Sequence, residues 1–180
     1  MKSYVALLRG IAPTNPNMRN NKLRQVFENL GFHNVRTVIS SGNVLFDTDA
    51  TDTKTLEAKI EKALPEQLDF TSTAIIRSKE QLQKLVNSNP FKNIEHSAKT
   101  HLNVTFLKIK PQTKLIFPLQ PDKKGYTILN MYGQDICSVV DLTGARTPDL
   151  MLWLEKQFGR EITTRTYKTV KRIVGKLNEG

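Results

Sequence analysis

The spacing of the apolar residues along residues 4–76 changes in a fixed order, and this order restricts the folds that the chain can adopt. Residues 4–8 form a continuous apolar run that is typical of a buried strand. Apolar residues then recur at helical spacing over residues 23–30, and Pro65 is expected to end a second helix. Residues 40–43, Ser-Ser-Gly-Asn, predict a tight hairpin turn. The predicted strand, helix, strand, strand, helix and strand are residues 4–8, 23–30, 34–39, 44–46, 56–64 and 73–76.

The second half of the sequence also mixes helices with hairpins, in a less regular order. Ser78 and Gln81 form a capping box that opens a third helix. Residues 126–140 read as a hairpin around Tyr132-Gly133. Thr147-Pro148-Asp149 combines a cap, a proline at the first helical position and an acid, and a last helix is expected near residues 167–177.

The order of the first half matches the βαββαβ pattern of ferredoxin-like domains. We therefore predict an α+β fold of two tandem ferredoxin-like domains with antiparallel sheets and a C-terminal helix, the second domain being a diverged repeat of the first. A polar segment at residues 87–99 predicts the boundary between them. The predicted domains are residues 1–88 and 89–180.

Charge is the feature of the composition that bears on partners. The 180 residues contain 27 Lys and Arg against 17 Asp and Glu, a formal net charge of +10. The excess lies mostly in the second half, because residues 91–180 contain 15 basic and 8 acidic side chains. A basic surface attracts polyanions such as nucleic acid, although net charge also serves solubility alone.

The cysteine content and the lack of motifs exclude several classes of function. Cys137 is the single cysteine, which excludes an intrachain disulfide and a cysteine-rich zinc site. The apolar run at residues 4–8 is too short for a signal peptide or a membrane span, so we expect a cytoplasmic protein without a transmembrane segment. No nucleophile elbow, phosphate-binding loop or dinucleotide fingerprint occurs, so we expect no cofactor and no metal.

Several separated motifs resemble those of one known family. The resemblance to the domain-of-unknown-function family 1697 (DUF1697) rests on residues 4–11, Leu30-Gly-Phe, Val35-Arg-Thr, residues 41–46 and the tail at residues 158–170. It implies a tandem pair of ferredoxin-like domains. The family has no established activity, so the resemblance implies no catalytic residue.

Two positions depart from the pattern of that family. Many members have a glycine-rich loop after the first strand, whereas residues 12–17 here contain two prolines and no glycine. Proline offers no backbone N–H, so this loop is poorly suited to cradle a phosphate. Thr166 stands where the C-terminal motif of the family has asparagine.

Six polar residues in loops and strand ends are candidate ligand-binding residues. Arg9 follows the first strand, and Arg165 precedes the last helix, where a helix N-terminus would suit a phosphate. Turn and capping chemistry explains most of these residues equally well. The candidates are Arg9, Asn15, Asn17, Ser41, Asn43 and Arg165.

The last helix carries the clearest electrostatic pattern in the sequence. At 100° per residue its basic residues share one arc and its apolar residues share the opposite arc. The apolar stripe is expected to pack on the body, and the basic stripe is either a solvated face or an anion-binding face. The basic stripe consists of Lys168, Lys171, Arg172 and Lys176.

These patterns lead to two hypotheses from different classes. The first is a non-enzymatic cytoplasmic protein that binds an anionic partner such as nucleic acid through the basic helix. The alternative is an enzyme for a small molecule or a phosphate ligand, with a site near Arg9 and the Ser41-Gly42-Asn43 turn. The sequence identifies neither a substrate nor an oligomeric state, and association through sheet edges is a third interpretation.

Overall fold

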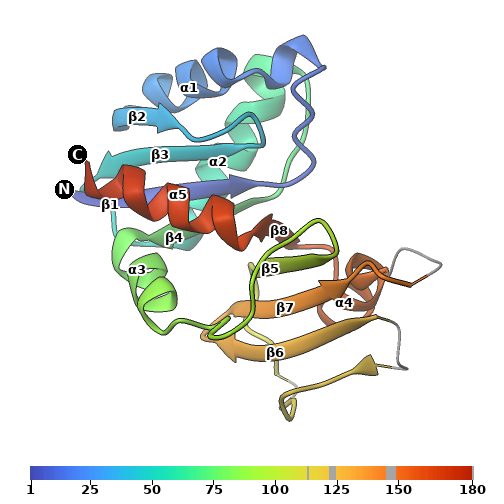
Figure 1. Ribbon diagram of the computed structural model, residues 1–180. Coiled ribbons are helices and arrows are strands. Elements are labelled where there is room, and N and C mark those ends of the chain that lie inside the picture. The colour runs from blue at the N-terminus through green and yellow to red at the C-terminus, as the bar shows by residue number, and fades with distance from the viewer. Residues whose placement is uncertain (113, 122–124, 145–148, 180) are drawn as a thin grey trace. The chain divides into compact units, whose positions relative to one another are not determined.

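Two antiparallel sheets of four strands each and five α-helices make up the described part of the chain, residues 1–112, 114–121, 125–144 and 149–179 of a computed structural model (Figure 1). This arrangement confirms the α+β class and the C-terminal helix. In chain order the elements are β1 (Lys2–Leu8), the 3-10 helix η1 (Pro16–Met18), α1 (Asn20–Asn29), β2 (His33–Thr37), β3 (Asn43–Thr48), α2 (Thr53–Leu68), β4 (Ala74–Ser78), α3 (Lys79–Asn87), β5 (Thr100–Leu107), β6 (Tyr126–Tyr132), β7 (Asp135–Asp141), α4 (Leu150–Phe158), β8 (Ile162–Thr166) and α5 (Tyr167–Asn178).

The chain divides into two compact units. The first contains residues 1–84 and 171–180, and the second contains residues 85–170. Both crossings between the units fall inside helices, α3 and α5. The division into independently folding domains at residues 1–88 and 89–180 stays a prediction.

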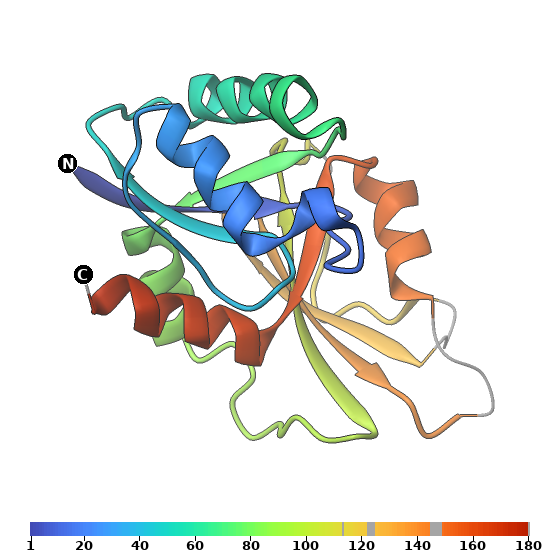
Figure 2. The same cartoon turned by 90° about the horizontal axis from the view of Figure 1, so that it is seen from above.

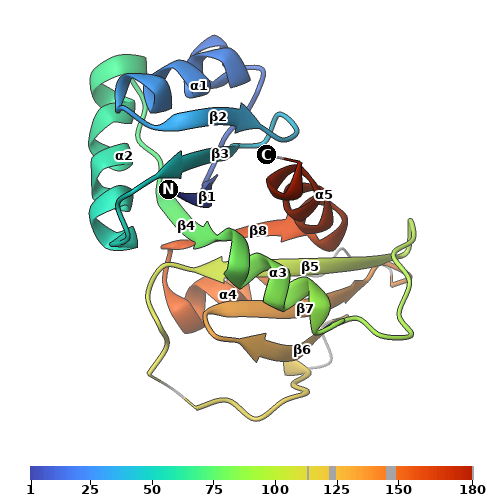
Figure 3. The ribbon, with the colours of Figure 1, turned by 90° about the vertical axis from the view of Figure 1, so that its left-hand side faces the viewer.

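The first sheet has the strand order β2-β3-β1-β4, and every neighbouring pair is antiparallel. Helices α1 and α2 cover one face of it (Figure 2). Alternate residues of β1 point toward these helices, as the two-residue period of a strand requires. The largest fully buried side chains of this core include Phe27, Phe46, Leu23 and Leu64. The second half of α5 lies on the opposite face of the same sheet (Figure 3).

Side chains close the exposed edge of this sheet at strand β4. The N–H of Ala74 donates to the Glu61 carboxylate and the N–H of Ile76 to the Glu57 carboxylate, both at 2.9 Å. The N–H of Ser78 donates to the Gln81 side chain at 2.8 Å, and Gln81 N–H donates to Ser78 Oγ at 3.2 Å, which confirms the predicted capping box. Unpaired edge N–H groups invite strand addition. Here all three are occupied by side chains from the helices that follow or cover the strand.

The second sheet has the order β6-β7-β5-β8, which places its strands as the first sheet places β2, β3, β1 and β4. Its core lies under α4 and includes Leu107, Ile136, Leu154 and Ile162. Between β5 and β6 the described residues form no α-helix, so this half does not show the complete βαββαβ order predicted for it. The two halves therefore share the order of strands in the sheet and a final strand–helix pair, β4–α3 and β8–α5.

The local structure corrects two predictions. Pro65 does not end α2, which continues to Leu68 and is followed by Asp69 at φ 56°. Pro65 removes one backbone hydrogen bond, and buried Leu68 gives the last turn an apolar contact that continues the helix. Residues 40–43 do not form a two-residue hairpin, because β2 ends at Thr37 and β3 begins at Asn43.

The start of α4 also differs from the prediction. Residues 147 and 148, which were expected to begin the helix, lie outside the described residues. Asp149 is the cap, and its side chain accepts a hydrogen bond from Leu152 N–H at 2.9 Å. Among the described residues, each helix is too short or too polar to span a lipid bilayer.

The edge of β4 yields a test of stability. Glu57 is 5% exposed, and replacing it with alanine leaves the buried N–H of Ile76 without its acceptor. We expect Glu57→Ala to lower the free energy of unfolding by about 1–3 kcal/mol, and Glu57→Gln, which keeps an acceptor oxygen, to lose less. Urea unfolding of both variants measures this, with exposed Glu66→Ala on the same helix as the control. Equal losses for the alanine and glutamine variants would contradict the role of the acceptor.

Candidate functional site

Hydrogen bonds join the end of β1 to the segment before β4 and to the loop after β2. Arg9 N–H donates to Thr73 O at 3.0 Å, and Ser72 Oγ donates to Arg9 O at 2.8 Å. Leu8 N–H donates to Gly42 O at 2.8 Å. Gly42 has φ 77°, and a Cβ at this position would come within 2.5 Å of Ile11, so only glycine fits there.

Two of the predicted ligand residues hold the loop of residues 38–42 in shape. Asn43 is 1% exposed, and its Nδ2 donates to Val38 O at 2.9 Å and to Ser41 Oγ at 3.0 Å. A second asparagine, Asn20, donates from Nδ2 to Ile39 O at 3.2 Å. These contacts give Ser41 and Asn43 a structural use in the loop.

The other predicted ligand residues lie in different surroundings. Asn15 caps η1, where its Oδ1 accepts from Asn17 N–H at 3.0 Å, and both residues are exposed. Arg165 lies in β8, is 9% exposed and belongs to the second compact unit, whereas the other five candidates belong to the first. Its Nη1 donates to Thr163 Oγ1 at 2.7 Å and to Thr164 O at 3.0 Å. Burial lowers the pKa of Arg165 to about 10.

The end of α5 is joined to β2 by a hydrogen bond that the sequence did not predict. Nη1 of Arg36 donates to the carbonyl oxygen of Lys176 at 3.1 Å. The last carbonyls of a helix lack intrahelical donors and carry partial negative charge, so an arginine there is favourable. The Nε of Arg36 is buried, and within the described residues it has no hydrogen-bond partner.

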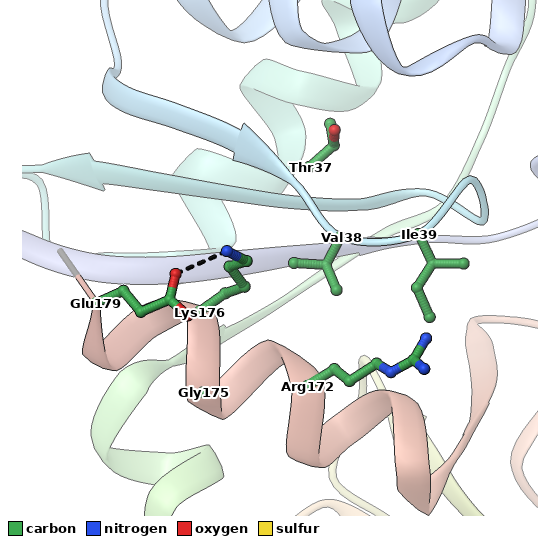
Figure 4. A pocket seen from close by; sticks show the side chains of 7 residues that line it. All are labelled: Thr37, Val38, Ile39, Arg172, Gly175, Lys176 and Glu179. Carbon is green, nitrogen blue, oxygen red and sulfur yellow. Dashed lines mark hydrogen bonds and ion pairs between the residues drawn. The ribbon is translucent and has the colours of Figure 1, made fainter.

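A groove of about 490 Å³ lies between the loop after β2 and the second half of α5 (Figure 4). On the strand side it is formed by Thr37, Val38 and Ile39, and on the helix side by Arg172, Gly175, Lys176 and Glu179. All seven residues belong to the first compact unit. Lys176 Nζ lies 2.7 Å from Glu179 Oε2, whereas the Arg172 side chain reaches toward Ile39 (Figure 4).

In the structure, the basic and the apolar residues of α5 lie on opposite faces of the helix, as the sequence predicts. The four basic residues of the predicted stripe, Lys168, Lys171, Arg172 and Lys176, are exposed. The apolar residues Val170, Ile173, Val174 and Leu177 are buried. Thr166 Oγ1 accepts from Thr169 N–H at 3.3 Å and begins the helix. Burial of the apolar face fixes the rotation of the helix and leaves its basic face toward solvent.

Two histidines lie near Lys168 in the second unit. The rings of His96 and His101 stack with their centroids 5.0 Å apart, a contact that no pattern in the sequence predicts. His96 Nδ1 accepts from Leu102 N–H at 3.2 Å, which requires that nitrogen to be unprotonated. Burial lowers the pKa of His96 below its ordinary value, and the charges of His101 and Lys168 lower it further.

Cys137 and the acidic residues give no sign of catalytic or metal chemistry. Burial, with the Asp135 carboxylate as a smaller cause, raises the pKa of the Cys137 thiol to about 12, so this side chain is a poor nucleophile. Asp52, which the sequence places before the second helix, caps α2 by accepting from the N–H groups of Lys54 and Thr55. The described residues contain no cluster of three or more His, Cys, Asp or Glu that could hold a metal ion.

The lowered pKa of His96 makes stability depend on pH. In the unfolded chain, His96 binds a proton more readily than in the folded protein. The free energy of unfolding is therefore expected to fall as the pH drops below 6.5, the ordinary pKa of histidine. His96→Asn, which keeps an acceptor for Leu102 N–H, should reduce that fall. Urea unfolding between pH 7.5 and 5, with exposed His33→Asn as the control, measures the difference. The same pH profile for His96→Asn and the unmodified protein would contradict it.

Comparison with known proteins places the chain in a family and in a known fold. The profile of the family described as "Protein of unknown function (DUF1697)" matches residues 1–136. The C-terminal motif at residues 158–170 lies beyond this match, so its resemblance stays a prediction. Among solved structures, conserved bacterial protein SP0830 from Streptococcus pneumoniae is similar, with 20% identity and a TM-score of 0.66 over 99% of each chain. At this identity the similarity shows a shared fold. No curated protein sequence matches the chain.

Proposed function

We propose that this chain, which belongs to the DUF1697 family, is a non-enzymatic protein that binds nucleic acid through the basic face of α5. The observation that carries the proposal is the separation of basic and apolar residues onto opposite faces of that helix. Four exposed cationic side chains occupy the face opposite four buried apolar ones. A row of cations on a rigid element can follow a phosphate backbone and release its counterions.

The charge around this face supports the same partner. Arg36 at the end of the helix adds a cation to the row, and Glu179 is the acid that faces the groove. Glu179 is engaged by Lys176, which leaves the Arg172 guanidinium as the donor beside the groove. The formal net charge of +10 favours association with any polyanion.

The remaining proposals concern architecture and location. We infer two tandem ferredoxin-like domains at residues 1–88 and 89–180, the second without its first helix, and a cytoplasmic location. Support for the architecture comes from the common strand order of the two sheets.

An enzyme or phosphate-ligand protein with a site near Arg9 is the weaker alternative. Its site would need the side chains of Ser41 and Asn43, and both take part in the hydrogen bonds that shape the loop. Asn15 caps η1. Most of the residues that suggested this alternative therefore have structural roles, and it depends on Arg9.

Salt dependence and charge reversal test the nucleic-acid proposal. We expect a labelled oligonucleotide to bind with an affinity that falls by a slope of about −3 in log K against log salt, as four phosphate contacts require. Lys168→Glu, Lys171→Glu and Arg172→Glu together should abolish binding. The matched control reverses three exposed lysines on α1 and α2, Lys22, Lys54 and Lys62, which changes the net charge by the same amount.

Two outcomes would contradict this proposal. One is no detectable binding of the unmodified protein at low salt. The other is an equal loss in the α5 variant and in the control, because binding would then depend on net charge and not on the helix face.

A further inference from the structure

The backbone of Ile39 is strained, and its side chain is exposed. Ile39 has φ 59°, in the left-handed region, where β-branched residues are genuine outliers. Full burial of the side chain could offset this strain, but Ile39 remains 42% exposed. Glycine or asparagine would adopt this conformation more easily. An exposed isoleucine kept in a strained backbone points to a use for its apolar surface.

The surrounding side chains hold Ile39 in one position. Asn20 Nδ2 donates to the carbonyl oxygen of Ile39 at 3.2 Å. The preceding residue, Val38, exchanges hydrogen bonds with Asn43, through Val38 N–H to Asn43 O at 3.0 Å and Asn43 Nδ2 to Val38 O at 2.9 Å. The loop therefore presents the apolar surface of Ile39, beside the largely buried Val38, in a preorganised form, which reduces the entropy lost on binding.

A cationic donor faces this apolar surface across the groove. The Arg172 side chain reaches toward Ile39 (Figure 4), and in the part of the chain that the structure describes its guanidinium has no hydrogen-bond or ion-pair partner. A guanidinium presents a planar fork of donors that matches the oxygens of a phosphate. Apolar surface and an anion receptor thus line the same groove.

We infer that this groove holds one nucleotide of a single-stranded nucleic acid, with the base against Ile39 and the adjacent phosphate on Arg172. The inference rests on the proposed function and specifies its substrate. The groove volume of about 490 Å³ lies in the range of small-ligand pockets, about 300–1,000 Å³. A duplex keeps its bases stacked and paired, so only a single strand can place a base in the groove while its backbone follows α5.

An acidic peptide is the other class of partner that an apolar groove with basic residues could attract. The observations favour the nucleic acid because the cations continue along α5 beyond the groove, to Lys171 and Lys168. A regular backbone of one charge per unit matches such a row of cations. The peptide is therefore included as a probe in the test.

The experiment uses Ile39→Gly in the full chain with four probes at fixed salt. The probes are a single-stranded oligonucleotide, its duplex, inorganic polyphosphate, and an acidic peptide of alternating glutamate and leucine. Because glycine relieves the backbone strain, the variant is expected to unfold at the same or a higher temperature. Thermal unfolding of Ile39→Gly beside the unmodified protein checks that a loss of binding does not come from misfolding. We expect about tenfold weaker binding of the single strand, as for the loss of one apolar contact surface, and unchanged binding of duplex and polyphosphate.

The arms separate failure of this inference from failure of the proposed function. Tighter binding of the single strand than of the duplex, lost selectively in Ile39→Gly and weakened by Arg172→Ala, supports the inference. If the unmodified protein binds duplex and polyphosphate, but binds the single strand no better or without dependence on Ile39, the inference is wrong and the proposed function stands. Ile39-dependent binding of the acidic peptide as tight as that of the single strand would also overturn the inference. No binding of any nucleic acid at low salt would overturn both.

Discussion

The packing of the last turns of α5 on the first sheet determines the surface on which the functional account depends. Arg36 and Lys176 are 140 residues apart in the chain, yet Nη1 of the arginine donates to the carbonyl oxygen of the lysine. Buried Ile173, Val174 and Leu177 fix the apolar side of the helix at the same place. The basic side therefore faces outward, and one edge of it forms a wall of the groove with residues 37–39.

In the same unit, polar side chains form hydrogen bonds with backbone groups that secondary structure leaves without a partner. Glu57, Glu61 and Gln81 accept the outer N–H groups of β4, while Asn20 and Asn43 donate to the carbonyls of the loop after β2. These contacts leave the β4 edge poorly suited to strand addition, which weakens the interpretation of self-association through this edge. These polar residues thus have a structural role, whereas the donors of Arg172 face the groove.

The sequence predicted the features that depend on local spacing and missed those that depend on tertiary contacts. The period of α5, the capping box of Ser78 and Gln81, and the strand and helix order of residues 4–76 could be read directly, because each is encoded by residues close together in the chain. Pro65 was misread, since packing of Leu68 overrides a local preference.

The candidate site was predicted only in part for the same reason. The stripe of α5 was found from its period, but no pattern in the sequence indicates that Ile39 has a positive φ or that Arg36 reaches the end of α5. The weak signal was the turn at residues 40–43, which located the loop and suggested Ser41 and Asn43 as ligands. Their contacts show that they build the loop beneath the residues that line the groove.

Nuclear magnetic resonance of the labelled protein, titrated with a short single-stranded oligonucleotide, tests the central claim most directly. The account predicts that the largest shift changes occur at the methyl groups of Ile39 and Val38 and at the side-chain Nε of Arg172, with smaller changes along the exposed face of α5. Changes confined to other surfaces, such as the exposed face of α2, would contradict it.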